Sequence, residues 1–187
     1  MILFINACVR ENSRTLHLAK DYISYYNNNN EPVTEVELCS AGLYPLGRDT
    51  LEKRESHIAE GNFTDEMFAQ AHLLKQADRI IIAAPYWDYS FPSLIKVWIE
   101  QLCVMGLTFD YSSEGIPTSL CSLNELVYIT TAGGYIPEKN FGYDYVCEVF
   151  TSFFGVKKCR CIKAEGLDIA GNDPEEIIKM TKREYRK

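Results

Sequence analysis

The sequence lacks the features of a membrane, secreted or nucleic-acid-binding protein. No apolar run approaches the roughly 20 residues needed to cross a bilayer, and the apolar start, residues 1–7, is too short for a secretion signal. The net charge is −7, and the only basic cluster lies at the very end of the chain. We therefore expect a soluble, cytoplasmic protein with no nucleic-acid and no membrane partner.

Metal-binding and disulfide patterns are also missing. The seven cysteines form no C-x-x-C pair, their number is odd and their spacing is irregular. Cys159 and Cys161 would share one face of a strand, which is a poor start for a tetrahedral metal site, and the three histidines lie elsewhere in the sequence. We expect no metal, and seven reduced thiols that act as small apolar residues.

What is present is the composition of one globular domain. The 187 residues are 47% hydrophobic and 24% charged, which suffices for a single domain with a sizeable core. No internal repeat and no linker divides the chain. We expect one domain over residues 1–187.

Apolar runs alternate with helical patterns along this domain. Such alternation predicts a parallel sheet with helices on both faces, joined by right-handed crossovers. Two strand orders compete, the six-strand dinucleotide-binding order and the five-strand order 2-1-3-4-5, and five expected strands favour the second. The strands are expected at residues 2–5, 33–38, 79–84, 126–131 and 157–164. The helices are expected at 13–26 (capped by Ser13), 64–76 (capped by Thr64), 92–105 (started by Pro92), 143–154 and from Asp173, its cap, onward, and the irregular segment 41–62 offers only a candidate helical turn at 49–60.

Three loops of unusual composition follow the first, third and fourth strands. In the order 2-1-3-4-5 these loops meet beyond the carboxyl ends of the strands, where open α/β sheets bind ligands. They span residues 8–15, 85–91 and 131–136. Their convergence is the main argument from sequence for a binding site.

The first loop leads into a helix start and favours an anion. Free backbone N–H groups and the helix dipole attract negative charge there, Ser13 and Thr15 add hydroxyl donors, and Arg10 and Arg14 add positive charge. The loop matches neither G-x-G-x-x-G nor G-x-x-x-x-G-K-[ST], so a single phosphate monoester suits it better than a dinucleotide or a triphosphate. An ordinary helix cap with exposed arginines is the alternative.

The other two loops suit a flat ligand. The second has four aromatic residues among six, and flat rings at a strand end favour stacking on a flat molecule. A plug of local hydrophobic packing is the alternative, although Asp88 is an odd neighbour for one. In the third loop the paired glycines Gly133 and Gly134 let backbone N–H groups approach a ligand, or else mark a simple turn.

Together these residues resemble the flavodoxin-like NAD(P)H:quinone oxidoreductases, and most closely the bacterial FMN-dependent NADH-azoreductases. The similarity spans nearly the whole chain. The chain departs from the family at Cys8, where Ser is frequent, and at Asp88, where the azoreductases usually have Asn. The matching stretches are residues 77–88, 91–96 with Glu100, 106–111 with Gly115, 130–134 and 164–167.

The resemblance implies a flavodoxin-like three-layer sandwich, non-covalently bound FMN, and a homodimer with two sites at its interface. NADH or NADPH would deliver hydride to flavin N5, and a quinone, azo compound or nitroaromatic would accept the electrons, so no side chain is expected to be catalytic in its own right. The residues expected at the phosphate are Arg10, Ser13 and Thr15, those along the flavin are Pro85, Tyr86, Trp87, Asp88 and Tyr89, and those at its other edge are Thr131, Gly133, Gly134 and Tyr135.

Two further expectations follow from the residues. The chain has one anion-binding loop and no second dinucleotide unit, so the nicotinamide and the acceptor must share one pocket, which predicts ping-pong kinetics. The expected helix at 92–105 is apolar around most of its circumference, which predicts packing against a second subunit unless residues 41–62 cover it.

Two other functions stay open at this point. One is a flavin-binding electron carrier or regulatory partner subunit with little turnover of its own. The other is an interaction module that binds no flavin.

Overall fold

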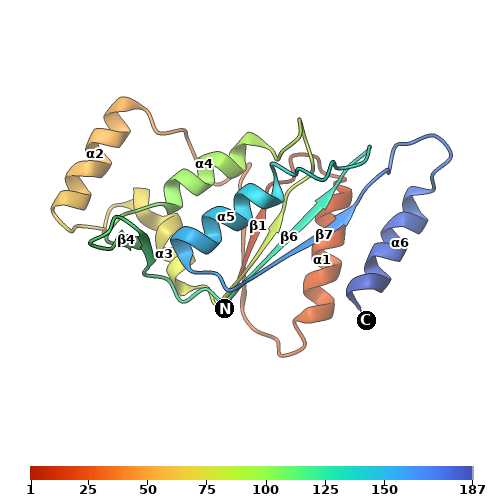
Figure 1. Cartoon of the computed structure of the whole chain (residues 1–187), viewed down its shortest axis with the longest axis horizontal. Helices are drawn as coiled ribbons and strands as arrows, with labels where there is room; N and C mark the ends of the chain where they lie inside the picture. Colours follow the sequence, from red (N-terminus) through yellow and green to blue (C-terminus); the bar gives the residue numbers. More distant parts are fainter. Residues whose placement is uncertain (187) are drawn as a thin grey trace.

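A computed structural model describes residues 1–186. Its centre is a five-stranded parallel sheet in the order β2-β1-β3-β6-β7. Strands β1, β6 and β7 of this sheet are labelled in Figure 1. Counting only the strands of this sheet, the order is 2-1-3-4-5, so the prediction from sequence is confirmed. The strands are β1 (Ile2–Asn6), β2 (Val33–Glu37), β3 (Arg79–Ala83), β6 (Glu125–Thr131) and β7 (Lys158–Ala164).

The helices follow the predicted pattern with small shifts at their ends. Ser13 caps the first helix by accepting a hydrogen bond from the Leu16 amide, and Asp173 caps the last by accepting from two amides of its first turn, both as predicted. The helices are α1 (Arg14–Tyr26), α2 (Arg48–Ala59), the 3₁₀ turn η1 (Glu66–Phe68), α3 (Ala69–Gln76), α4 (Ser93–Leu102), α5 (Tyr143–Phe154) and α6 (Pro174–Tyr185).

Two helix boundaries differ from the prediction. The cap before η1 is Asp65, which accepts from the Met67 amide, because the Thr64 hydroxyl donates instead to Asn62 Oδ1, at 2.7 Å. Helix α4 begins after Pro92 and ends at Leu102, three residues early, because the Thr108 hydroxyl binds the Leu102 carbonyl, at 2.6 Å, and draws the chain out of the helix.

A short antiparallel hairpin was not foreseen. Strands β4 (Phe109–Tyr111) and β5 (Pro117–Ser119) pair with each other outside the main sheet. The hairpin leaves several apolar side chains exposed at its tip and base. They are Met105, Tyr111, Ile116 and Leu120.

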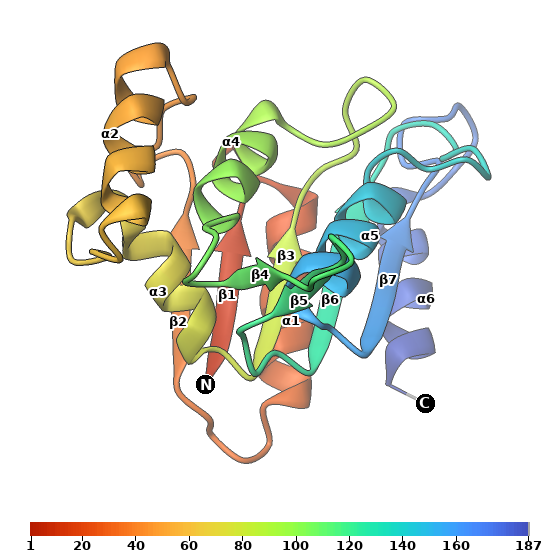
Figure 2. The same ribbon diagram turned by 60° about the vertical axis from the view of Figure 1, so that its left-hand side comes forward.

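Alternate residues of the strands belong to two separate hydrophobic clusters, one on each face of the sheet. Leu3 and Ile80 belong to a cluster with α3, α4 and α5, whereas Phe4 and Ile81 belong to a cluster with α1 and α6. Figure 2 shows α4 and α5 on one side of the sheet and α1 and α6 on the other. A strand buried on both sides needs a continuous apolar sequence, which explains the runs in β1 and β3.

Helix α2 is tied to α4 by one buried cation. Arg54 is only 7% exposed, and its guanidinium donates to the carbonyl of Glu100, at 2.8 Å, and to that of Cys103. These carbonyls lie at the end of α4, where unpaired acceptors and the negative end of the helix dipole favour a cation. The contact fixes the end of α4 opposite to the loop that starts it.

No helix within residues 1–186 combines the length and the apolar character needed to span a membrane.

Candidate functional site

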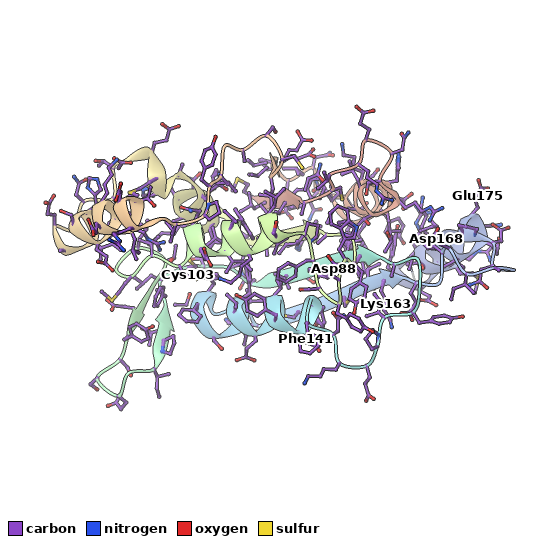
Figure 3. All side chains as sticks on the ribbon, turned by 90° about the horizontal axis from the view of Figure 1, so that it is seen from above. Asp88, Cys103, Phe141, Lys163, Asp168 and Glu175 are labelled. Carbon is purple, nitrogen blue, oxygen red and sulfur yellow. The ribbon has the colours of Figure 1, made fainter. Side chains whose placement is uncertain are left out.

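A cleft of about 450 Å³ opens at the carboxyl edge of the sheet. The loops after β1, β3, β6 and β7 all contribute to it. In the view from above, Asp88 and Asp168 mark two of these loops (Figure 3). The lining residues are Val9, Arg10, Asn12, Ser13, Arg14, Thr15, Pro85, Tyr86, Trp87, Thr131, Ala132, Gly133, Leu167 and Asp168.

The first loop presents the start of α1 to this cleft. The first hydrogen bond within the helix runs from the His17 amide to the Ser13 carbonyl, at 3.0 Å, so the amides of Arg14 and Thr15 precede it. Ser13 Oγ accepts from the Leu16 amide, at 3.3 Å, and its own hydrogen stays available to a ligand. These donors and the helix dipole favour an anion.

Thr15 and Thr131 join the first loop to the third. Their hydroxyl oxygens lie 2.7 Å apart, and Thr15 is only 1% exposed. One of the two hydroxyl hydrogens is used between them, which leaves the other for a ligand. Thr15 therefore holds the site together as well as lining it.

The second loop is a tight two-residue turn. Trp87 and Ser90 exchange two backbone hydrogen bonds, of 3.1 and 2.7 Å, around Asp88 (φ 51°) and Tyr89 (φ 65°). Both central residues are left-handed, as in the primed turns of hairpins, and this conformation is costly for tyrosine. The turn carries the exposed Asp88 and Tyr89 out at its tip and leaves Trp87 against the cleft.

The third loop is fastened to the segment after β7. Three backbone amides donate to it: Gly166 to Gly134 at 2.9 Å, Leu167 to Ala132 at 3.1 Å, and Asp168 to Gly133 at 2.9 Å. These bonds bring Asp168 to the cleft.

A side chain at Gly133 would meet the Asp168 side chain. A Cβ atom built there would lie 2.5 Å from Asp168 Oδ2, whereas at Gly134 it would meet nothing within 4 Å. The Asp168 carboxylate thus lies directly against Gly133, and it accepts a hydrogen bond from Arg14 Nη1 at 2.8 Å.

Charge in the cleft comes from two arginines and one carboxylate. Arg14 pairs with Asp168, whereas Arg10 has no ion-pair partner within residues 1–186. Cys8 lies beneath the loop, where burial raises the pKa of its thiol to about 11 and keeps it neutral. Burial also raises the pKa of Tyr86, whose hydroxyl is buried without a hydrogen-bond partner.

The structure brings eight of the twelve predicted residues together in the cleft lining. Those in the lining are Arg10, Ser13, Thr15, Pro85, Tyr86, Trp87, Thr131 and Gly133. The four outside it, Asp88, Tyr89, Gly134 and Tyr135, lie on the same loops beyond the lining, and Tyr135 is 70% exposed. Residues 1–186 contain no cluster of three or more His, Cys, Asp or Glu suited to a metal.

Six residues of the cleft lining are not among the site residues predicted from the sequence. The charge of Arg14 was noted without a contact being assigned to it, and Ala132 lies inside a predicted loop. Leu167 and Asp168 follow the fifth strand of the sheet, whose loop showed no unusual composition. The missed lining residues are Val9, Asn12, Arg14, Ala132, Leu167 and Asp168.

Comparison with known proteins supports the fold and the family that the sequence resembles. The family described as having the flavodoxin-like fold matches residues 1–187. The FMN-dependent NADH:quinone oxidoreductase 2 of Clostridium acetobutylicum is 31% identical over 189 residues, which cover 96% of this chain and 93% of that protein.

Solved structures share the fold. An azoreductase from Bacillus anthracis superposes with a TM-score of 0.84 at 23% identity, covering 99% of this chain and 96% of its own. An FMN-dependent NADH-azoreductase from Bacillus anthracis, solved in complex with FMN, superposes with a TM-score of 0.82 at 19% identity, covering 99% and 95%. Since the family matches the full length and the clostridial relative covers nearly all of it, the chain belongs to the flavodoxin-like family.

Proposed function

We propose that this protein is an FMN-dependent NAD(P)H oxidoreductase that reduces quinones, azo compounds or similar flat acceptors. The observation that carries the proposal is one cleft that joins an anion-favouring helix start to an aromatic loop. The names of the clostridial quinone oxidoreductase and of the Bacillus azoreductases support the same activity.

The residues of the cleft fit FMN. Its phosphate suits the end formed by Arg10, Ser13 and the first amides of α1, where the free guanidinium and the helix dipole favour an anion. Its flat ring suits the side lined by Tyr86 and Trp87. Nothing in this arrangement requires a covalent bond to the cofactor.

The remaining predicted residues surround the open side of the cleft. We propose that Pro85, Thr131 and Gly133 contact the flavin from the lining. Asp88, Tyr89, Gly134 and Tyr135 lie on the same loops and would meet the ring or the bound substrate from the rim. Because Asp88 is exposed, solvent screens the effect of its charge on the flavin.

When bound, FMN supplies hydride chemistry at its N5 position. The protein positions the flavin and shields it from solvent. The titratable side chains that line the cleft are Arg10, Arg14, Tyr86 and Asp168. Burial keeps Tyr86 protonated, and the arginines are permanently charged. We therefore assign no acid–base residue.

We also propose that the nicotinamide and the acceptor use this cleft in turn. The two flat molecules would stack on the same side of the aromatic loop and could not be bound together. Double-reciprocal plots with NADH and a soluble quinone should then be parallel, and excess quinone should inhibit competitively against NADH. Intersecting lines would contradict a shared site.

A homodimer and a cytoplasmic location complete the proposal. Segment 41–59 covers the end of α4, because Arg54 and the Tyr44 carbonyl both contact that helix, whereas Leu94 and Val97 remain half-buried on it. A second subunit would cover them. The odd number and irregular spacing of the seven cysteines suit a reducing compartment.

The activity is tested by steady-state consumption of NADH by the FMN-loaded protein with a soluble quinone as the only acceptor. Sustained turnover that depends on added FMN is expected. Flavin that NADH and NADPH leave oxidised, and that only a partner protein reduces, would favour an electron carrier instead.

A further inference from the structure

The phosphate end of the cleft contains a carboxylate. Asp168 Oδ1 accepts a hydrogen bond from Arg14 Nη1 at 2.8 Å, and both residues line the cleft. A carboxylate in a site that favours anions repels a bound phosphate. Its presence there requires an explanation other than the binding of FMN.

Hydrogen bonds to the third loop hold the backbone of Asp168 in place. The amide of Asp168 donates to the Gly133 carbonyl at 2.9 Å, and the neighbouring amide of Leu167 donates to Ala132. Asp168 Oδ2 lies against Gly133, where a Cβ atom would come within 2.5 Å of it. Figure 3 shows Asp168 on the loop between β7 and α6.

Arg14, in contrast, is free to exchange partners. It is the first residue of α1, next to the amides that favour an anion, and its long side chain is 48% exposed. The Asp168 side chain is 68% exposed. An ion pair this exposed is weak, so a phosphate with two negative charges can compete with it.

We propose that Asp168 limits the affinity for FMN by competing with its phosphate for the Arg14 guanidinium. In the free protein Arg14 is bound to Asp168, and FMN must displace this contact and accept a nearby negative charge. Asp168 is thus a residue that sets cofactor affinity and the preference for FMN over the unphosphorylated flavin. The inference rests on the proposed function, because it assumes that FMN occupies this cleft.

The test compares FMN with riboflavin, which has the same ring but no phosphate. Flavin-free protein is titrated with each flavin, and quenching of flavin fluorescence gives the dissociation constant. Asp168→Asn should bind FMN about three- to tenfold more tightly, with riboflavin unchanged. Glu184→Gln, near the end of α6, is the control for the loss of one negative charge.

A second variant tests the partner exchange itself. Arg14→Gln should weaken FMN binding more in the Asp168→Asn background than in the unsubstituted protein, because only there is Arg14 free for the phosphate. Weaker FMN binding by Asp168→Asn, equal shifts for FMN and riboflavin, or additive effects of the two substitutions would overturn the inference. If the unsubstituted protein binds neither flavin, the proposed function fails and this inference fails with it.

Discussion

The hydroxyl oxygens of Thr15 and Thr131 lie 2.7 Å apart, between the first turn of α1 and the end of β6. This contact joins the loop at the proposed phosphate end of the cleft to the loop at its other edge. Thr15 is 1% and Thr131 9% exposed, so solvent reaches this pair only through the cleft. The relative position of the two loops therefore depends on this pair.

Replacing Thr15 by Val keeps the shape of the side chain and removes its hydroxyl. The Thr131 hydroxyl is then left without its partner, and we expect the free energy of unfolding to fall by about 1–3 kcal/mol. FMN affinity should fall as well, since the two loops lose their link. Urea denaturation of the flavin-free protein measures the first effect, with the exposed Thr118→Val as control. Equal stability of both variants would contradict the pair.

Ser13→Ala tests two roles of the Ser13 hydroxyl, as the helix cap and as a donor to the phosphate. It removes the acceptor for the Leu16 amide and should cost about 0.5–2 kcal/mol of stability. It also removes a hydroxyl donor, so FMN affinity should fall by a further contribution of about 0.5–1.5 kcal/mol. An FMN affinity that is unchanged in titrations of the Ser13→Ala, Thr15→Ala double variant would refute the placement of the phosphate.

The two neighbouring glycines of the third loop should respond differently to alanine. Gly133→Ala forces a Cβ atom to within 2.5 Å of Asp168 Oδ2, so the Asp168 side chain or the loop must move. Gly134→Ala meets nothing within 4 Å. We expect the larger loss of stability at Gly133, measured by thermal unfolding. The opposite ranking would show that the loop is packed differently.

Arg54 should matter for stability although it lies far from the cleft. Arg54→Met leaves the carbonyls of Glu100 and Cys103 without a donor, and we expect a loss of about 1–3 kcal/mol. Burial lowers the pKa of Arg54, so the charge is held at a cost that the two hydrogen bonds offset. Arg54→Lys keeps the charge without the fork of donors and should be intermediate in urea denaturation. A fully stable Arg54→Met would contradict this role.

The proposed homodimer predicts the molecular mass in solution. Light scattering at micromolar concentration should give twice the mass of one chain, because the apolar side chains left half-buried on α4 favour a second copy. A monomeric mass would show that segment 41–59 is the only cover that this helix needs.

Local signals explain which parts of the fold could be predicted. Ser13 and Asp173 are identified as caps because the side chain bonds to its own helix within three residues. At Thr64 and Asp65 two capping residues are adjacent, and only the contact with Asn62 shows which one is used. The hairpin β4–β5 has strands of three residues each, too short for an alternating pattern to be visible.

The family and the loops that form the cleft could be predicted from the sequence, and the predicted family is confirmed. The role of Asp168 could not be predicted, because its partner Arg14 lies 154 residues away in the sequence. Only the backbone hydrogen bonds between the third loop and the segment after β7 bring Asp168 to the cleft. The turn at Asp88 and Tyr89 was hidden as well. Asp88 suits the first left-handed position of such a turn, but the second position, where Gly is usual, has Tyr89.

The visible absorption spectrum, recorded without oxygen before and after addition of NADH, tests the central claim most directly. The protein, incubated with FMN and freed of unbound flavin, should show the spectrum of one bound oxidised flavin per chain, and stoichiometric NADH or NADPH should bleach it. A protein that retains no flavin, or a bound flavin whose spectrum neither nicotinamide changes, would contradict the account.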